Sequence, residues 1–333
     1  MTEFSLIDTR GDLDESAHRV RVAVVDDTGR VVALAGDPDT LVFWRSAAKP
    51  FQLWPLVAGG GVERFGLGGR HLALACGSHS AEPAHREIAA DWLARIGVPE
   101  SALSCGGHPS LSTRVAEAMI RDGVTTTPIW SNCSGKHAAM LGLAVLHGWP
   151  LEGYPDPGHP VQTAIANSIS LWSGVGLDRL AWGVDGCTAA AVATPLTALA
   201  LAWARLGVTD DAAMVVIREA MLDHPELVAG TDRFDTVLMS SWQRRILAKV
   251  GAEGVYAAAI PELRLGVALK VEDGDMRVAA QALVSVLHAL LGHVAPERDW
   301  PWPSLAHWYE PEIRNTRGDV VGQTISRGLL RFP

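Results

Sequence analysis

The first part of the chain alternates between apolar and polar side chains, as half-buried strands do. The alternation is regular over residues 20–24, a second apolar segment covers 31–34, and Asp27-Thr28-Gly29 lies between them. A period of two on both sides of a turn sequence predicts a β-hairpin over residues 17–36. A third short strand is expected over residues 40–44.

Further along, apolar residues recur every three or four positions, which is typical of helices buried on one face. Helices are expected over residues 81–96, 112–121, 138–146, 161–172, 195–204, 212–222 and 277–293. Buried strands are expected over residues 71–75, 129–131, 180–184, 254–260, 265–271 and 319–326. Strands stand early and late with helices between them. We therefore predict a single α/β domain over residues 1–333, whose sheet closes through both termini.

The composition narrows the class of protein. The 333 residues are 48% hydrophobic and 20% charged, which is typical of a globular enzyme and not of a disordered chain. The formal net charge is −9 and no basic cluster occurs, so nucleic acid is not an expected partner. A small-molecule substrate fits this composition better.

The location of the protein is predicted from its apolar stretches and cysteines. The N-terminal region is polar and lacks the apolar core of a signal peptide. The most apolar stretch, residues 188–204, is interrupted by Pro195 and is predicted to be a buried helix, not a membrane span. We therefore expect a cytoplasmic protein without membrane contact. In that compartment its cysteines are expected to be reduced, namely Cys76, Cys105, Cys133 and Cys187.

The first candidate for chemistry follows the strand that ends at Arg45. Ser46 stands where a helix is expected to begin, and a serine there caps free backbone N–H groups. Lys49 lies one turn on and on the same face, and Pro50 falls in the first turn, where proline is tolerated. Ser-x-x-Lys is the nucleophile motif of serine β-lactamases and penicillin-binding proteins. The alternative is a capping serine followed by a solvated lysine.

Two further residues extend this candidate site. Ser78 lies on the loop after a short buried strand, and Lys270 lies near the end of another strand. Together with Ser46 and Lys49 they stand at strand ends or helix starts, where elements converge on a cleft. Two lysines close together favour a neutral form of one, because each raises the cost of protonating the other. The alternative for Ser78 is a turn serine.

A second group of candidates is Cys133, Lys136 and Cys187. The two cysteines each follow a short predicted strand, so they could meet at one edge of a sheet. Thiolates are good zinc ligands, whereas a lysine must first lose its proton to bind a metal. The spacing contains no Cys-x-x-Cys, so buried free cysteines remain the alternative.

At this point the sequence resembles a known family, the L-asparaginases of the rhizobial type, or asparaginase II. The resemblance covers most of the chain, in family order. It rests on Arg45-Ser46-Ala47-Ala48-Lys49-Pro50, Cys76-Gly77-Ser78-His79, Cys105-Gly106-Gly107-His108-Pro109, Asn132-Cys133-Ser134-Gly135-Lys136-His137, Asp185-Gly186-Cys187, Gly251-Ala252-Glu253-Gly254-Val255, and Ala268-Leu269-Lys270 with Asp273-Gly274.

The resemblance implies hydrolysis of the side-chain amide of L-asparagine to L-aspartate and ammonia. It implies a fold similar to serine β-lactamases, penicillin-binding proteins and glutaminases, with a sheet flanked by helices. Ser46 would be the nucleophile and Lys49 its base, while Ser78 and Lys270 would form a second Ser–Lys pair.

The resemblance also implies a metal, substrate-binding residues and an oligomer. Cys133, Lys136 and Cys187 would bind a zinc ion, with water completing its coordination. Arg45 and Asp185 would hold the carboxylate and ammonium groups of the substrate, as their charges suit. His137 would support the metal ligands. The protein would be a homodimer.

Departures from the family pattern bear on selectivity. The sequence differs from the family pattern at positions that could border the substrate, namely Thr188-Ala189-Ala190, Asp232 and Ala257.

Two other functions stay open. The enzyme alternative is a β-lactamase-like or glutaminase-type hydrolase, although Lys270 is not followed by the Thr-Gly of the Lys-Thr-Gly motif. The non-enzyme alternative is an inactive homologue that binds zinc or a ligand.

Overall fold

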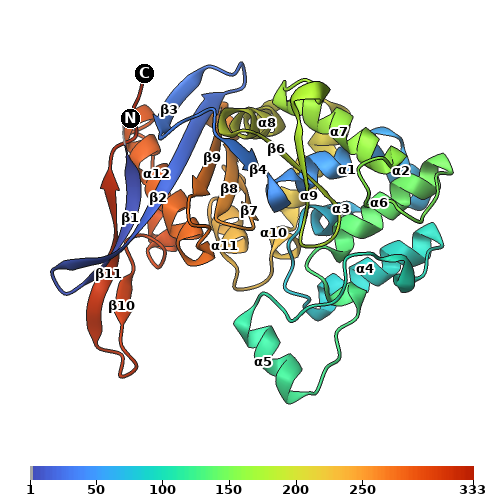
Figure 1. The fold of residues 1–333 in the computed structure, drawn as a ribbon, viewed down its shortest axis with the longest axis horizontal. Helices are drawn as coiled ribbons and strands as arrows, with labels where there is room; N and C mark the ends of the chain where they lie inside the picture. The colour runs from blue at the N-terminus through green and yellow to red at the C-terminus, as the bar shows by residue number, and fades with distance from the viewer. Residues whose placement is uncertain (1–2) are drawn as a thin grey trace. The chain divides into compact units, whose positions relative to one another are not determined.

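The computed structural model describes residues 3–333, and these form two compact units that are interleaved in the sequence (Figure 1). The sheet unit consists of Met1–Val42, Thr194–Val208 and Ser241–Pro333. The helical unit consists of Phe43–Ala193 and Thr209–Ser240. The organisation as one domain stays a prediction, and each unit is described by itself.

The sheet unit is built on an antiparallel sheet with strand order β10-β11-β1-β2-β9-β8-β7, in which β3 pairs with β2. β1 pairs with β11 from Phe4↔Gly328 to Asp8↔Thr324, so the prediction that the sheet joins both termini is confirmed (Figure 1). The strands are β1 Phe4–Arg10, β2 Leu13–Asp26, β3 Val31–Ala35, β7 Leu247–Gly251, β8 Val255–Ile260, β9 Leu265–Val271, β10 Glu312–Arg314 and β11 Val320–Gly328.

Two apolar helices, α8 Leu196–Val208 and α12 Met276–Val294, pack on strands of this sheet. A Cβ atom on Gly266 would lie 1.9 Å from the Ala200 carbonyl oxygen, so only glycine lets β9 and α8 approach so closely. Within the described residues, α12 has the length and composition of a membrane span. More than half of its apolar window, 56%, is buried inside the protein, as in a core helix. The 3-10 helices are Pro261–Leu263 and Trp302–Leu305.

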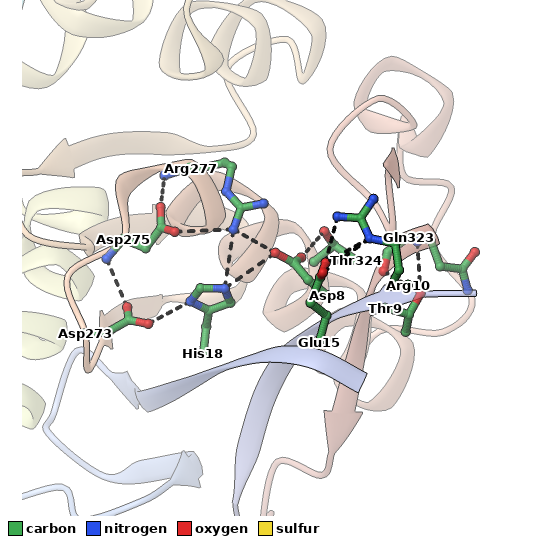
Figure 2. A network of polar contacts seen from close by, with 10 residues as sticks. All are labelled: Asp8, Thr9, Arg10, Glu15, His18, Asp273, Asp275, Arg277, Gln323 and Thr324. Carbon is green, nitrogen blue, oxygen red and sulfur yellow. Dashed lines mark hydrogen bonds and ion pairs between the residues drawn. The ribbon is translucent and has the colours of Figure 1, made fainter. Parts of the chain in front are cut away.

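A polar network in the sheet unit ties its two terminal strands to the start of α12 (Figure 2). Asp8 lies at its centre and accepts hydrogen bonds from Arg277 at 2.7 Å and from the Thr324 hydroxyl at 2.6 Å. His18 contacts Asp273 at 2.7 Å from its Nδ1 atom. The network therefore joins β1, β2, β11 and the turn before α12 through charged side chains.

The helical unit packs α1, α3, α6, α7 and α9 against one another. Its helices are α1 Lys49–Ala58, α2 Gly61–Phe65, α3 Gly69–Cys76, α4 Pro83–Ile96, α5 Thr113–Arg121, α6 Ser134–His147, α7 Pro160–Ser173, α9 Ala212–Asp223, α10 Pro225–Val228 and α11 Phe234–Ser241. Its 3-10 helices are η1 Arg45–Ala48, η2 Glu100–Ala102, η3 Pro128–Trp130 and η4 Leu177–Arg179. A small sheet has the order β4-β6-β5, with β4 Leu41–Phe43, β5 Ala181–Val184 and β6 Ala190–Pro195.

The expected α/β class, with helices on a sheet, is confirmed, but several local predictions are wrong. Residues 71–75 form part of α3 and not a strand, and residues 128–130 form the 3-10 helix η3. The apolar stretch 188–204 is divided between strand β6 and helix α8. Short apolar runs carry no period that separates a buried strand from a buried helix, so packing decides between the two. Strands β1, β6, β7 and β10 were not predicted.

Candidate functional site

Ser46 lies inside a turn of 3-10 helix and does not cap the following helix, which corrects the local prediction. Arg45–Ala48 forms η1, and α1 then begins at Lys49 with Ala48 as its N-cap. A 3-10 helix has three residues per turn, so Ser46 and Lys49 project on the same side. Arg45 has φ 49°, in the left-handed region that is unfavourable for a residue with a Cβ atom. The backbone is therefore strained one residue before the candidate nucleophile.

Lys49 is buried, with only 1% of its surface exposed, so the solvated-lysine alternative is wrong. Its Nζ atom lies 3.1 Å from Ser78 Oγ and 3.4 Å from the Asn132 carbonyl oxygen, and it also donates to the Gly77 carbonyl. A carbonyl oxygen accepts hydrogen bonds but cannot donate them. When the amine is neutral, the two carbonyls thus take its two hydrogens, and the lone pair faces Ser78 Oγ.

Ser78 is held just after the C-terminus of α3, and not at the end of a strand as predicted. It is buried, and its backbone N–H donates to the Val228 carbonyl at 2.8 Å. A Cβ atom on the preceding Gly77 would lie 2.6 Å from the Leu227 carbonyl oxygen. The glycine therefore lets this segment pass close to the backbone beside α10, and this fixes where Ser78 can stand.

Lys270, the fourth candidate, lies in the sheet unit on β9 and is partly buried. Its Nζ atom donates to the Val271 carbonyl and, at 3.5 Å, to the Glu272 carbonyl. Burial lowers the pKa of Lys270 and outweighs the opposing effect of neighbouring carboxylates, Glu253 first among them. Its catalytic role stays a prediction.

The sequence reasoning passed over a second lysine of the sheet unit. Lys249 on β7 is 0% exposed, and its Nζ atom donates to the Val250 carbonyl at 2.8 Å. Fully buried lysines are rare in proteins. The signal that could have found it is Lys249-Val250-Gly251, which has the spacing of Lys-Thr-Gly with valine in place of threonine.

Arg45 and Asp185, the predicted substrate-binding pair, are in contact with each other. Arg45 donates from Nε and from Nη2 to Asp185 Oδ1, each at 3.0 Å, and both side chains are mostly buried. The backbone N–H of Gly186 donates to the same carboxylate oxygen at 2.8 Å. The two charges therefore hold each other in place and form one dipolar unit beside Ser46.

The three predicted metal ligands also lie together, and all are buried. Lys136 Nζ lies 2.8 Å from Cys187 Sγ, and the Cys133 thiol donates a hydrogen bond to the Cys187 sulfur. That bond and the Lys136 ammonium lower the pKa of Cys187, whereas the same contact and burial raise the pKa of Cys133. These contacts favour the thiolate form at Cys187 over the thiolate form at Cys133.

This donor set suits a zinc ion. Two sulfur atoms and one amine converge, which is the softness and number of protein ligands that zinc accepts in an open site. Burial lowers the pKa of Lys136, but the Cys187 and Cys133 sulfurs raise it more, so the amine must lose a proton before it binds a metal. Within residues 3–333 no group of three histidines, cysteines or carboxylates gathers as a metal site, so the zinc site stays a prediction.

Two buried histidines near these groups are held in place by hydrogen bonds. His137 is fully buried and its Nδ1 atom lies 2.6 Å from the Tyr154 hydroxyl. Burial lowers the pKa of His79 well below its usual range. His79 Nδ1 accepts the Ala81 N–H at 3.1 Å, so its Nε2–H donates to Ser134 Oγ at 2.9 Å. His79 was missed because these contacts follow no sequence spacing.

The family model for L-asparaginase II matches residues 7–326. Since that is nearly the whole sequence, the chain belongs to the L-asparaginase II family, and this membership indicates an amidohydrolase. Comparison with curated proteins gives no match.

Several solved structures are similar to the chain at low identity. Native Mglu, determined in 4.3 M NaCl, is 17% identical with a TM-score of 0.38, and the match covers 84% of this chain but only 61% of that one. A β-lactamase from Mycobacterium bovis is 12% identical with a TM-score of 0.36, covering 82% and 94%. An octameric penicillin-binding protein homologue from Pyrococcus abyssi is 16% identical with a TM-score of 0.33, covering 90% and 79%.

Proposed function

We propose that this protein is an L-asparaginase that hydrolyses L-asparagine to L-aspartate and ammonia through a serine nucleophile. Family membership supports the amide substrate. The observation that carries the serine chemistry is the buried contact of 3.1 Å between Lys49 Nζ and Ser78 Oγ, one turn from Ser46. A lysine held beside a hydroxyl in a buried site is the arrangement that activates serine nucleophiles.

The proposed reaction has two stages. Ser46 Oγ attacks the side-chain amide carbon while its proton passes to Lys49. The C–N bond then breaks, and the same proton is returned through the Ser78–Lys49 contact to the leaving ammonia. Water then hydrolyses the aspartyl ester and restores Ser46. The carbonyls of Gly77 and Asn132 hold Lys49 so that its remaining position faces Ser78, which suits proton transfer between these two groups.

The second lysine of the site has two candidates. The family resemblance gives Lys270. The burial of Lys249 favours that residue as an alternative, because it is 0% exposed whereas Lys270 is partly exposed. The Nζ atom of each lysine donates to the carbonyl of the residue that follows it. Perturbed, buried ionisable groups concentrate at functional sites.

Cys133, Lys136 and Cys187 would hold the proposed zinc ion. When bound, zinc would position the substrate or act as a Lewis acid, since a serine nucleophile makes metal-bound water unnecessary. The Tyr154 hydroxyl lies 2.6 Å from His137 Nδ1 and would fix the ring of the residue next to Lys136. Arg45 and Asp185 are proposed to bind the charged groups of the substrate.

The assembly and location of the protein stay part of the proposal. The reduced, buried state of the four cysteines supports a cytoplasmic location. The homodimer rests on the family resemblance alone.

The test is ammonia release from L-asparagine by the wild-type protein and by Ser46→Ala, with L-glutamine as a second substrate and zinc measured in the same samples. We expect turnover of L-asparagine by the wild type, and loss of it in Ser46→Ala with zinc retained. Full activity of Ser46→Ala would contradict the nucleophile assignment.

The two alternatives are separated by further measurements. Turnover of nitrocefin in place of L-asparagine would favour a β-lactamase-like hydrolase. Binding of zinc and L-asparagine without turnover would favour an inactive homologue.

A further inference from the structure

The loop before α5 contributes a histidine to the surroundings of Lys49. Residues 106–127 form an arm that carries α5, and α5 stands apart from α3 and α6 of the helical unit (Figure 1). At its base a Cβ atom on Gly107 would lie 2.7 Å from the Thr127 carbonyl oxygen. The two ends of the arm therefore touch, and the next residue, His108, is fixed at this base.

His108 accepts a hydrogen bond from Asn132, the residue whose carbonyl contacts Lys49. The backbone N–H of Asn132 donates to His108 Nε2 at 3.0 Å. Since a backbone N–H can only donate, this Nε2 atom carries no proton, and Nδ1–H donates to the Pro109 carbonyl at 2.7 Å. Both ring nitrogens are thus engaged, and the ring cannot turn without breaking one of these bonds.

The carbonyl of Asn132, which belongs to the next peptide group along the chain, faces the candidate catalytic groups. The Asn132 carbonyl accepts from Lys49 Nζ at 3.4 Å and from the His79 backbone N–H at 3.3 Å. Within residues 3–333, the Gly77 carbonyl is the other carbonyl that accepts from Lys49 Nζ. The direction in which Nζ faces Ser78 therefore depends on how the backbone of Asn132 is held on both sides of its Cα atom.

We propose that His108 is a positioning residue for Lys49, acting through the backbone of Asn132. This inference rests on the proposed serine amidohydrolase function, and it adds a residue that the sequence reasoning did not assign to the site. His108 contacts neither Lys49 nor Ser78 directly. It holds the N–H of the residue whose carbonyl takes one of the Lys49 hydrogens, and through that residue it sets the orientation of the amine toward Ser78.

The test compares His108→Ala with His108→Gln, whose side-chain oxygen can accept the Asn132 N–H in place of Nε2. We expect His108→Ala to lower kcat for L-asparagine by about tenfold or more while KM changes less than about threefold, because misplacing a reacting group slows the chemical step. His108→Gln is expected to restore most of kcat.

Arg114→Ala is the matched control. Arg114 lies on α5 and pairs with Glu82 at 3.0 Å and with Asp232 at 3.1 Å, so its removal loosens the arm without touching His108. An equal loss of kcat in Arg114→Ala, or an equal loss in His108→Gln, would overturn the inference, because the effect would then belong to the arm as a whole or to general packing.

A second readout does not depend on turnover. Amide hydrogen exchange at Asn132 is expected to be faster in His108→Ala and unchanged in His108→Gln and Arg114→Ala, because only the first loses the acceptor. An inactive wild type would contradict the proposed function, and exchange would then decide the inference by itself. Unchanged exchange at Asn132 in His108→Ala would overturn it.

Discussion

Lys49 Nζ lies 3.1 Å from Ser78 Oγ, although the two residues are separated by 29 positions in the sequence. The motif that singles out Lys49 in the sequence pairs it with Ser46, three residues earlier. One lysine therefore lies next to both candidate serines, by helical spacing to one and by direct contact with the other. Several measurable consequences follow from this arrangement.

The two serines should differ in how far their removal lowers kcat and in whether a covalent intermediate still forms. Ser46→Ala is expected to lower kcat for L-asparagine by about 10³-fold or more, because it removes the nucleophile. Ser78→Ala is expected to cost about 10²-fold to 10⁴-fold, the usual range for a proton-transfer partner. Mass spectrometry after rapid acid quenching detects a covalent aspartyl-enzyme and decides between the two roles. A covalent adduct that persists in Ser46→Ala but is absent in Ser78→Ala would exchange the two assignments.

Replacing Lys49 by methionine should separate activity from stability. The variant keeps the length of the side chain and removes a buried amine, so ammonia release is expected to fall by about 10²-fold or more. The melting temperature is expected to change by only a few degrees, because removing the cost of burying the amine offsets the loss of its hydrogen bonds to two carbonyls. A melting temperature lower by many degrees would show that Lys49 is needed mainly for folding.

The two lysines of the sheet unit can be compared in the same way. We expect Lys249→Met to reduce kcat at least ten times more than Lys270→Met, on the ground that Lys249 is fully buried and Lys270 is not. Steady-state kinetics with L-asparagine measures both variants, and circular dichroism checks their folding. The opposite order would support Lys270 as the second base, as the family resemblance implies.

The affinity for zinc should depend on two of the four cysteines. Cys133→Ser and Cys187→Ser are each expected to lower the affinity for zinc by at least about tenfold, because a thiolate ligand is lost. Cys105→Ser is the matched control, since Cys105 is also buried but its thiol donates to the Pro128 carbonyl at 3.5 Å. Competition with a chromophoric chelator gives the affinities. Equal zinc binding by all three variants would remove these residues from the metal site.

The stability of the sheet unit should fall in acid because of the network in Figure 2. Burial raises the pKa of Asp8, but the hydrogen bonds from Thr324 and Arg277 outweigh it, so the net pKa lies below its usual value. A carboxyl with a lowered pKa in the folded state stabilises the fold above its unfolded pKa, about 3.9. That stabilisation is lost as the pH falls through the folded pKa.

Thermal unfolding of Asp8→Asn across the acid range tests this sign. The variant is expected to lose roughly 2 kcal/mol at neutral pH, where the charged hydrogen bonds are intact in the wild type. Its melting temperature is expected to fall less steeply with acid than that of the wild type. Asp14→Asn, at an exposed ion pair with Arg327, is the control and should behave as the wild type. An acid dependence in Asp8→Asn as steep as in the wild type would contradict the role of Asp8.

The sequence by itself determined the parts of this protein that depend on short-range patterns. Alternation over residues 20–24 gives strand β2 of the hairpin, and the period near 3.6 gives α4, α7 and α12 close to their observed bounds. The three-residue spacing of Ser46 and Lys49 puts both on one side of the chain, and this holds in a 3-10 turn as well as in an α-helix.

Only the tertiary structure decided which of these residues meet. The contacts of Lys49 with Ser78, of Cys133 with Cys187 and of Arg45 with Asp185 join segments far apart in the sequence, and no local period records them. The same holds for residues 71–75, whose apolar run folds as helix α3 because α3 packs on α6 and α9. Every residue other than proline carries a backbone N–H and a backbone C=O, so residue type does not show which of these groups bind side chains. The hydrogen bonds of the Asn132 backbone to Lys49 and to His108 therefore become visible only once the chain is folded.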